Sequence, residues 1–594
     1  MLLDDEPETP DFAHDPALGL PRRTKFEILS AILLAMFLGA LDQTIVGPVL
    51  PRIVGDLNGS DYYTWVVTAY LLTSTVSVPV YGKLSDLYGR RPVLMFGISV
   101  FVIGSALSGL SQTMWQLIVF RGLQGLGAGA LFPIALAVIG DLFTPAERGK
   151  YQGLFGAVFG VAFLLGPGLG GFLTDTFSWH AIFFVNVPLG IITLIVIGAL
   201  LPNIKKEGAR PVIDYLGTFA LVMGLVPILV ALTIAENGDW SNPLVWGLIV
   251  LGAVSLVGFV LIEQRATEPI IPLHLFRNRT FSVSMVAIFL ATFGFGAAII
   301  FLPLYYQVVQ GASATESGYK LLPFLVGLIF SSILSGQIVA RTGHYKWTLL
   351  VGMVLLAIGL GLMTQLRYDT PDAQLWSWMF IAGLGVGPTF AVFTIVVQNS
   401  VPFHELGAAT SDLTLFRQIG TTVGLTMAFT LFRNNLTWDL LRTEIVGRGV
   451  PAAMVPATPP PGFDLGELTN PVGAAQALDL LSKLPTQVQG LFVEGFHAAL
   501  SIAIANSMWL GVFATIGALG ATTLLHEIPL RAHHGPAPEP VVAVDAEGGI
   551  PAGAIAAGAI AAGAEAGGMA SNEVGAEGGL RQGGQRPAVE RPTG

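Results

Sequence analysis

The sequence predicts an all-α polytopic membrane protein with fourteen transmembrane helices. Three observations support this fold class: 53% of the 594 residues are hydrophobic, only 11% are charged, and the mean hydropathy is +0.69. A soluble chain is about 25% charged, so this chain has too few charges to cover the surface of water-soluble domains. The absence of cysteine excludes a disulfide framework and any cysteine-based metal site or nucleophile.

Fourteen segments are long enough to cross a membrane, because a helix that spans the hydrocarbon core needs about 20 mainly apolar residues. Strands of a β-barrel would be about ten residues long and alternate in polarity. These segments are longer and apolar on all sides, which favours helices. The predicted spans are 26–48, 64–81, 93–111, 114–140, 152–172, 180–201, 216–234, 243–262, 280–307, 318–340, 347–365, 375–398, 409–432 and 500–525.

Lysine and arginine indicate on which side of the membrane each loop lies, since cytoplasmic loops carry the excess of both. With a cytoplasmic N-terminus, each inside loop up to residue 346 is basic, while the outside loops hold little beyond Arg52, Lys320 and Arg367. We therefore expect a multi-pass protein of a bacterial-type cytoplasmic membrane with both termini in the cytoplasm. The first span lacks a small-residue cleavage site after it, so we interpret it as a retained helix and not a signal peptide.

Three segments lie outside the predicted membrane region. Residues 1–25 form a cytoplasmic N-terminal segment. Residues 433–499 form a long outer segment with a proline run and a weakly amphipathic stretch near 474–494, which predicts a partly helical flap. Residues 532–594 are rich in alanine and glycine and can bury little apolar surface, so we expect a disordered cytoplasmic tail.

Two short sequence matches recur at nearly the same offset and indicate an internal repeat. Residues 82–89 (GKLSDLYG) match 336–343 (GQIVARTG), and residues 121–129 (RGLQGLGAG) match 379–387 (MFIAGLGVG). Both matches fall at equivalent positions in the order of predicted helices, which makes chance agreement a poor explanation.

The repeat predicts two six-helix halves, 26–201 and 280–531, with two inserted helices in the linker 202–279. Such a protein is typical of a secondary transporter, whose substrate lies near the midplane between halves that rock against each other. The sequence contains no P-loop, so the energy comes from an ion gradient or from the gradient of the substrate itself.

Asp42 and Arg121 are charges inside predicted spans, where a charge is costly and therefore a functional hypothesis. At 1.5 Å per residue, both lie roughly 10–12 Å below the outer surface, which predicts a direct or water-bridged contact. Asp42 in a low-dielectric site could carry a proton, and movement of Arg121 against it could control protonation. The alternative is a structural role, in which Asp42 braces the first helix at a kink before Pro48.

The loop from Gly82 to Pro92 (GKLSDLYGRRP) has the composition of a conformational gate. Its glycines permit close helix approach and a tight turn. Asp86 could lie near a helix N-terminus or pair with a cation such as Arg148. The alternative for Arg90 and Arg91 is topology alone, since the positive-inside rule would explain much of their presence. The predicted gating residues are Gly82, Asp86, Gly89, Arg90, Arg91 and Arg148.

Two further features lie within predicted spans. Gly166, Pro167, Gly170 and Gly171 predict a kinked, closely packed helix that serves as a hinge or seal between the halves. Arg417 is the one deep charge of the second half; it could bind an anionic group or hydrogen-bond backbone carbonyls across the bundle, and we favour the second role.

The sequence shows no catalytic cluster, no metal-binding spacing and no dinucleotide fingerprint, so we expect neither an enzyme nor a cofactor. The basic runs are short and lie next to the membrane, which argues against nucleic acid as a partner. The expected partners are the lipid bilayer, protons and small hydrophobic or amphipathic substrates, and we expect a functional monomer.

These motifs together resemble the fourteen-helix drug:proton antiporter family of the major facilitator superfamily. The resemblance covers about residues 26–531, and its motifs occur in the expected order on the expected helices. It departs from the family pattern at Gly47–Pro48 and at His180, and the span 318–340 lacks the acidic residue that some drug pumps carry. The segments that carry it are LDQTIV from Leu41, GKLSDLYGRRP from Gly82, RGLQG from Arg121, GPGLGG from Gly166, NVPLG from Asn186, PLHLFRNR from Pro272 and RQIG from Arg417.

The resemblance implies a major facilitator fold and a multidrug efflux antiporter driven by the proton gradient, a type of protein associated with antibiotic resistance. It implies that Arg121 takes part in proton coupling and that the motif at Gly166 favours export. We expect the substrate chamber to be lined by the spans 26–48, 114–140, 152–172, 280–307 and 409–432. Two alternatives remain open: an exporter of an endogenous lipid or metabolite on the same fold, and a non-transporting membrane sensor or scaffold.

Overall fold

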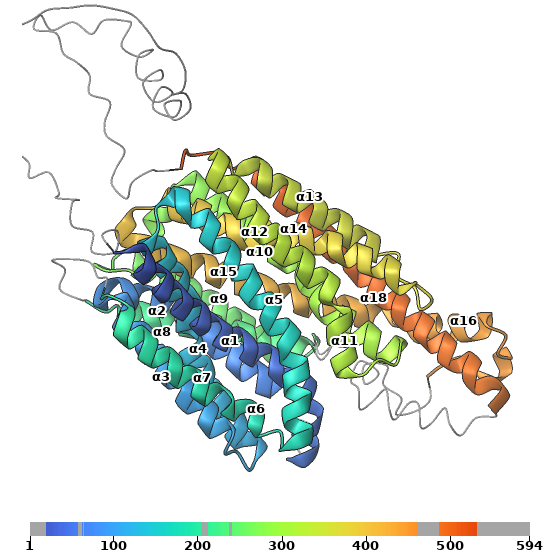
Figure 1. The fold of residues 1–594 in the computed structure, drawn as a ribbon. Coiled ribbons are helices and arrows are strands. Elements are labelled where there is room, and N and C mark those ends of the chain that lie inside the picture. Colours follow the sequence, from blue (N-terminus) through green and yellow to red (C-terminus); the bar gives the residue numbers. More distant parts are fainter. Residues whose placement is uncertain are drawn as a thin grey trace, which may run out of the picture. The chain divides into compact units, whose positions relative to one another are not determined.

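The computed structural model describes residues 20–57, 62, 64–203, 212–236, 240–459 and 486–530. Every regular element in these ranges is a helix (Figure 1). The predicted tail at 532–594 lies outside the described residues. So do most of the predicted N-terminal segment 1–25 and the middle of the predicted outer segment 433–499.

The first half consists of helices that match its six predicted spans. The last of these spans is divided, because α6 and α7 are separated at Val185. The first helix continues through Pro48 and Pro51, beyond the predicted end at residue 48. The helices are α1 (Arg22–Asp56), α2 (Trp65–Tyr88), α3 (Arg90–Ser108), α4 (Met114–Leu142), α5 (Pro145–Thr176), α6 (Ala181–Phe184) and α7 (Asn186–Leu200).

Two helices of the linker, α8 (Tyr215–Glu236) and α9 (Pro243–Glu263), pack against each other and lead into the second half. In the second half the chain forms a short π-helical turn, Tyr305–Val309, directly after α10. The helices of the second half are α10 (Arg279–Leu304), α11 (Ala314–Lys320), α12 (Leu322–Thr342), α13 (Lys346–Met363), α14 (Asp372–Ser400), α15 (Leu406–Asn435), α16 (Trp438–Gly447) and α18 (Thr486–Thr523).

Twelve helices of the described part are long and apolar enough to cross a membrane, whereas the sequence predicted fourteen spans. The other two predicted spans lie in α2 and α15, which have 24 and 30 residues. Both helices carry buried polar residues, for example Ser77 and Asp86 on α2 and Asp412 on α15, which lower their hydropathy. These two helices pack against each other, so their polar side chains face protein.

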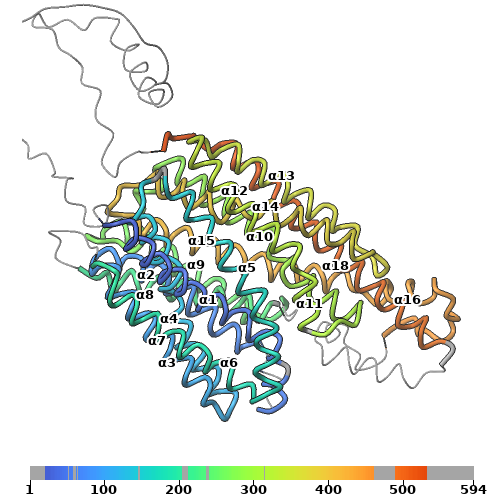
Figure 2. The backbone as a smooth tube through the Cα atoms, viewed as in Figure 1, coloured from blue at the N-terminus to red at the C-terminus, as the bar shows by residue number. Residues whose placement is uncertain are grey.

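The packing of the helices repeats between the two halves. In the first half α4 packs on α2 and α3, and α1 packs on α5; in the second half α14 packs on α12 and α13, and α10 packs on α15. The two halves meet where α5 lies against α12 and α14 and where α2 lies against α15 (Figure 2).

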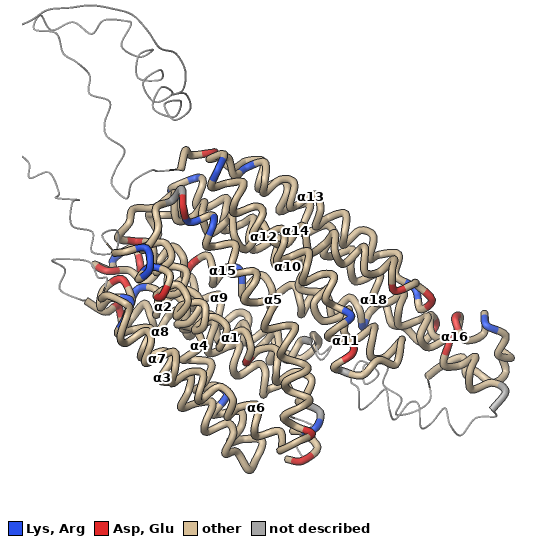
Figure 3. The backbone as a smooth tube through the Cα atoms, viewed as in Figure 1, with Lys and Arg blue, Asp and Glu red and all other residues tan. Residues whose placement is uncertain are grey.

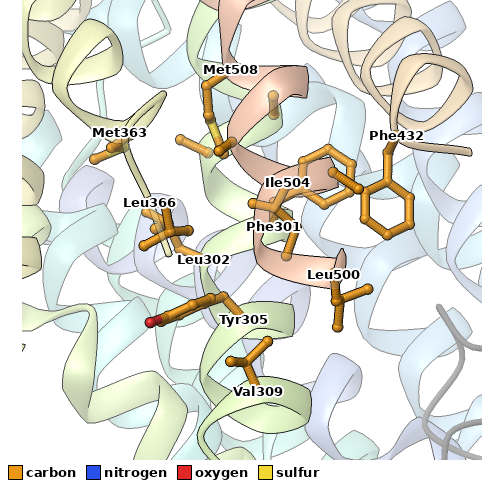
Figure 4. Close-up of a cluster of buried hydrophobic side chains, with 14 of the residues drawn as sticks. Phe301, Leu302, Tyr305, Val309, Met363, Leu366, Phe432, Leu500, Ile504 and Met508 are labelled. Atoms are coloured by element: carbon orange, nitrogen blue, oxygen red, sulfur yellow. The ribbon is translucent and has the colours of Figure 1, made fainter. Parts of the chain in front are cut away.

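Each half has its own hydrophobic core. The largest cluster lies in the second half, where side chains of α10, the π-helical turn, α15 and α18 interdigitate (Figure 4). Phe301, Tyr305, Phe432, Ile504 and Met508 in this cluster are fully buried. Aromatic and branched side chains of this size bury large apolar areas, which fixes how these helices sit against one another.

Charged residues gather at the two ends of the helices, and few lie between the ends (Figure 3). We call the end at which α2 stops and α3 starts the Arg90 end, and the end that carries α16 the Trp438 end. The scarcity of charge between the ends makes each charge that does lie there informative, since burying one is costly.

The last span differs from its predicted start at residue 500, because α18 begins at Thr486. The early part of α18 packs against α16, and a Cβ atom at Gly495 would lie 2.7 Å from Ile445 Cα. Hydropathy marks only where a helix becomes apolar, so it missed these first turns. The part of the predicted outer segment that the structure describes is partly helical, as expected.

Candidate functional site

Asp42 on α1 has no exposed surface and forms an ion pair with Arg121 on α4. Arg121 Nη1 donates to Asp42 Oδ2 over 2.7 Å, and Arg121 is itself 2% exposed. The equal helix depths of the two residues therefore correspond to a direct contact. Their predicted part in proton transfer stays a prediction.

Two amide side chains that the sequence analysis did not assign complete the surroundings of Asp42. Gln124 Nε2 and Asn186 Nδ2 donate to Asp42 Oδ1 over 2.8 and 2.9 Å. Gln124 also accepts from Arg121 Nη1 at 2.7 Å. Gln124 follows Arg121 by three residues, a spacing that puts both on one face of a helix, so this member could have been found from the sequence.

Further side chains hold the Asp42 pair in place. Asn186 Nδ2 donates to Ser105 Oγ over 3.1 Å, which ties α7 to α3. The Arg121 guanidinium lies over the Tyr70 ring of α2, with 4.2 Å from Cζ to the ring centroid. A cation over an aromatic face is attracted by the ring quadrupole, so Tyr70 helps to hold the Arg121 guanidinium in place. The site thus unites α1, α2, α3, α4 and α7.

A second charged cluster lies at the Arg90 end. Arg90 Nη1 donates to Asp86 Oδ1 over 2.5 Å, and Arg90 Nε donates to Asp141 Oδ2 over 2.8 Å. Ser85 Oγ also accepts from Arg90 Nη1, at 2.7 Å. All four side chains are buried, and Asp141 at the end of α4 was not among the predicted gating residues.

Asp86 connects this cluster to the other half of the protein. Its carboxylate accepts from the backbone N–H groups of Gly407 and Ala408, at 3.2 and 2.9 Å, in the first turn of α15. A carboxylate is favourable there, because the first N–H groups of a helix lack intrahelical partners and the helix dipole is positive at that end. Both predicted surroundings of Asp86 are present in the structure: the N-terminus of α15, and a cation, which is Arg90.

The glycines of this region have different tasks. A Cβ atom at Gly82 would lie 2.5 Å from Ser411 Cβ, so Gly82 lets α2 approach α15 closely. Gly89 has a φ of 100° between α2 and α3, a conformation that glycine adopts readily.

The two remaining predicted gating residues lie beside this cluster. Arg148 is buried and donates to the carbonyl oxygens of Phe143 and Gly140, over 3.0 and 2.6 Å. Arg91 is half-buried at the start of α3. Arg148, in the first turn of α5, thus ties the start of α5 to the end of α4.

The predicted hinge residues of α5 face both halves. A Cβ atom at Gly166 would lie 2.7 Å from Thr44 Cβ, and one at Gly170 would lie 2.8 Å from the Ile45 carbonyl oxygen. Thr44 Oγ1 also donates to the Ala162 carbonyl over 2.9 Å. Because Thr44 follows Asp42 by two positions, α1 and α5 are in contact close to Asp42.

The other side of α5 lies against the second half. Cβ atoms at Gly171 and Gly318 would lie 3.3 Å from Thr315 Oγ1 and 3.0 Å from Pro167 Cγ, which brings α5 against α11. Towards the Arg90 end α5 lies against α12, where the backbones of Gly149 and Gly336 come together so closely that neither residue has room for a Cβ atom.

A buried glutamine pair also joins the halves, and the sequence analysis missed it. Gln152 Nε2 on α5 donates to Gln398 Oε1 on α14 over 2.7 Å. Gln398 Nε2 donates to the Leu136 carbonyl of α4 at 3.0 Å and to Thr410 Oγ1 of α15 at 3.2 Å. Glutamines are uncharged and these two are 246 residues apart, so no sequence signal relates them.

Arg417 on α15 is 7% exposed, and its Nε and Nη2 atoms have no hydrogen-bond partner among the described residues. Its guanidinium lies over the Phe390 ring, with 4.7 Å to the centroid, and 5.7 Å from the Phe155 ring centroid. Nε and Nη2 of Arg417 therefore do not form the hydrogen bonds to backbone carbonyls that the sequence analysis favours.

Asp412, five residues before Arg417, is fully buried, and both its oxygens lack a hydrogen-bond partner among the described residues.

Glu527, beyond the end of α18, fastens the C-terminal side of that helix to α13. Its Oε1 accepts from the backbone N–H groups of Tyr345 and Lys346 at 2.8 and 3.3 Å, and its Oε2 lies 3.4 Å from His344 Nδ1. Burial raises the pKa of Glu527, but the backbone hydrogen bonds and His344 outweigh it, so this pKa lies below the ordinary 4.5.

The described residues hold no group of three or more histidine, aspartate or glutamate side chains that could bind a metal ion.

The family model described as Major Facilitator Superfamily matches residues 32–425 of this sequence. This range includes the Asp42 pair, the Asp86 cluster, the glutamine pair and Arg417.

Several curated proteins are similar along most of the chain. Multidrug transporter protein MdtP of Bacillus subtilis (strain 168) is 38% identical over 501 residues, which cover 83% of this chain and 91% of that protein. Multidrug resistance protein 3 of the same strain is 38% identical over 415 residues, covering 70% and 80%. Efflux pump dotC of Dothistroma septosporum (strain NZE10 / CBS 128990) is 32% identical over 513 residues, covering 85% of each chain.

Solved structures share the fold, and one of them serves as an example. The crystal structure of the human organic anion transporter MFSD10 (TETRAN) superimposes with a TM-score of 0.50 at 17% sequence identity, covering 70% of this chain and 94% of that chain. At this identity the likeness concerns the arrangement of helices and not the substrate.

Proposed function

This chain belongs to the Major Facilitator Superfamily, and we propose that it is a proton-coupled antiporter that exports hydrophobic or amphipathic compounds by alternating access. It is a multi-pass membrane transporter and not an enzyme. The names of its relatives, multidrug transporters and efflux pumps, support small molecules as substrates.

The proposal includes the topology. We propose that α2 and α15 complete a set of fourteen spans, that the Arg90 end faces the cytoplasm, and that a single chain transports. The burial of the polar residues of α2 and α15 against each other supports their place inside a membrane bundle.

The observation that carries the proposal is the fully buried Asp42 carboxylate, held by one cation and two amides. With Asp42 ionised, the pair has no net charge and its polar atoms are largely satisfied. A proton on Asp42 would cancel the carboxylate and leave Arg121 as a buried cation without a counter-ion. Such a charge is strongly unfavourable in a low-dielectric interior, so protonation would favour a rearrangement of α1 against α4.

The packing of α1 offers a route from this rearrangement to the two halves. Thr44, two residues from Asp42, bonds to α5 and lies against Gly166. The opposite side of α5 lies against α11 and α12 of the second half. A shift of α1 would therefore reach the contacts between the halves directly. One proton that crosses 100 mV supplies about 2.3 kcal/mol, enough for a modest gradient of the exported compound.

The test is the accumulation of a fluorescent dye in cells that express the protein, with and without an uncoupler. We expect the wild type to lower dye accumulation only while the proton gradient exists, and Asp42→Asn to abolish this effect. Asp56→Asn is the matched control, because Asp56 lies on the same helix and is exposed. Normal uncoupler-sensitive export by Asp42→Asn would refute the coupling role.

The same cells distinguish the alternative substrates. If no dye is exported but the lipid composition of the membrane changes on expression, the exporter acts on an endogenous lipid. If truncation after residue 530 removes the effect of the protein while its helices remain inserted, a scaffold or sensor role gains support instead.

A further inference from the structure

Arg417 lies at the depth where a major facilitator binds its substrate. It follows the first residue of α15 by eleven positions, so it lies about 16 Å along the helix. The hydrocarbon core is about 30 Å thick, which places Arg417 near its midplane if α15 starts at the membrane surface. Phe155 of the first half and Phe390 of the second half both lie within 6 Å of its guanidinium carbon.

The surroundings of Arg417 differ from those of the other buried arginines. The described part of the chain has four buried arginines, and three of them have oxygen partners. Arg90 donates to carboxylates, Arg121 donates to a carboxylate and an amide, and Arg148 donates to backbone carbonyls. Arg148 illustrates what a structural arginine looks like in this chain. Arg417 instead keeps two N–H atoms, Nε and Nη2, without a hydrogen-bond acceptor among the described residues.

The rings near Arg417 form a continuous aromatic cluster across both halves. Phe155 and Phe159 of α5 are 5.7 and 5.9 Å from Phe390 of α14, and Phe132 of α4 stacks on Phe159 at 5.1 Å. Phe295 of α10 lies 6.2 Å from Phe390. Phe159 and Phe390 are only half-buried, so part of this aromatic surface is open to a ligand.

We propose that Arg417 and this aromatic cluster form a substrate subsite for compounds that combine an aromatic ring with an anionic group, such as a carboxylate or sulfonate. The inference rests on the proposed function and specifies its substrate class. An anion beside Nε and Nη2 satisfies both N–H groups, since a guanidinium presents its donors in a fork that fits a carboxylate. The ring of the compound packs against the phenylalanines, with offset or edge contacts.

The charge of the site also predicts what it rejects. A cationic compound at this position would meet Arg417 with no acidic residue to offset it, because the described residues give Arg417 no carboxylate partner. Neutral aromatic compounds would keep the ring contacts and lose the ionic hydrogen bonds. The subsite therefore ranks compounds in the order anionic, neutral, cationic.

The experiment compares N-dansylglycine with N-dansylglycinamide, which share the ring and differ in the carboxylate. The full-length protein in lipid nanodiscs contains ten tryptophans, whose energy transfer to the dansyl group reports binding without any proton gradient. We expect the wild type to bind the carboxylate at least about tenfold more tightly than the amide, a difference of about 1.4 kcal/mol. Arg417→Gln should remove this preference and leave the affinity for the amide within about twofold.

Two further variants keep the test decisive. Arg367→Gln, which alters an exposed arginine between α13 and α14, should bind both probes as the wild type does. Arg417→Lys keeps the charge and should retain part of the preference. If Arg417→Gln binds neither probe, Arg417→Lys decides: a retained preference supports the subsite, and a preference lost with amide binding intact overturns it.

The inference is overturned if the wild type binds both probes equally, or if Arg417→Gln keeps the preference for the carboxylate. These results leave the proposed export function untouched, because export of a neutral dye is measured separately in cells. Conversely, failure of uncoupler-sensitive export with normal dansylglycine binding would refute the antiporter and leave the subsite standing.

Discussion

Asp86 at the end of α2 accepts a hydrogen bond from the backbone N–H of Ala408, over 2.9 Å, at the start of α15. A side chain of the first half thus satisfies the N-terminus of a helix in the second half. The hydrogen bond exists only while α2 and α15 are in contact, since Asp86 belongs to the first half and Ala408 to the second. It therefore stabilises the conformation in which the Arg90 end is closed.

Asp86→Asn should weaken this closed conformation. The amide keeps the shape but loses the negative charge that the helix N-terminus favours, which is worth about 1–2 kcal/mol in a partly buried setting. We expect the Arg90 end to open about 5- to 30-fold more often. The chain has no native cysteine, so a single Ser332→Cys reporter, buried between α5 and α12, can measure this as a faster reaction with a thiol reagent.

Asp439→Asn is the control for this measurement, because Asp439 is an exposed carboxylate at the opposite end of the protein. An unchanged labelling rate in Asp86→Asn would mean that the carboxylate does not hold the halves together.

Gly336→Ala should block the same closure by steric means. A Cβ atom there would overlap the backbone of Gly149 on α5, and backbone atoms cannot turn aside as a flexible side chain can. Overpacking of this kind costs about 1–3 kcal/mol or more. We expect export to fall at least about fivefold while the amount of protein in the membrane stays normal.

Gly361→Ala is matched to that variant, since a Cβ atom at Gly361 would meet nothing within 4 Å. It should export as the wild type does. If both alanine variants export normally, the close approach of α5 and α12 is not needed for transport.

How far the sequence predicted the site depends on whether a fixed helical geometry relates its residues. Asp42 and Arg121 could be matched in depth because the rise of a helix is constant. Gln124 was within reach through its spacing from Arg121. Gln152 and Gln398 were not, because their contact depends on how α5 and α14 are rotated and packed.

In the fold, too, some features could be predicted from the sequence and others depend on packing. Apolar segments located the helices and the repeat ordered them, because hydropathy and internal similarity are properties of the sequence itself. The start of α18 at Thr486 was missed, since its first turns pack on α16 and not on lipid. For Asp86 the sequence left two surroundings open, and the structure contains both: the packing of α2 on α15 puts a helix N-terminus beside Asp86, and Arg90 supplies the cation.

Glu527 predicts a pH dependence of stability. The pKa of Glu527 is lower in the folded protein than the ordinary value of 4.5. Its contribution to the free energy of unfolding is therefore fully present above pH 4.5 and is lost as the pH falls through the pKa of the folded protein. Glu527→Gln should lower the unfolding free energy in detergent by about 1 kcal/mol at pH 7, as for the loss of a helix cap.

The difference between wild type and Glu527→Gln should then shrink as the pH is lowered below 4.5. Thermal unfolding followed by the intrinsic tryptophan signal measures both proteins across this range. A difference that stays constant down to the lowest accessible pH would show that the ionised carboxylate is not what fastens α18 to α13.

The glutamine pair predicts a coupling between the halves that a double-mutant cycle can measure. Gln398→Leu removes the amide that bridges Gln152, Leu136 and Thr410, and it leaves Gln152 Nε2 without the acceptor it has at 2.7 Å. A buried donor without a partner costs about 1–3 kcal/mol. We therefore expect Gln398→Leu to raise the thiol reactivity of the Ser332→Cys reporter about 5- to 150-fold. Gln152→Leu should also raise the reactivity, because it leaves Gln398 Oε1 without the donor it has at 2.7 Å.

The double variant Gln152→Leu with Gln398→Leu is the decisive member of this cycle. If the two amides act mainly on each other, replacing both by apolar groups restores much of the closure, and the double variant reacts more slowly than either single variant. Additive effects would contradict a direct coupling and would mean that Gln398 acts through Leu136 and Thr410 alone. Because the pair is uncharged, the effect should not change with ionic strength, which separates it from the Asp86 contact at the same end of the protein.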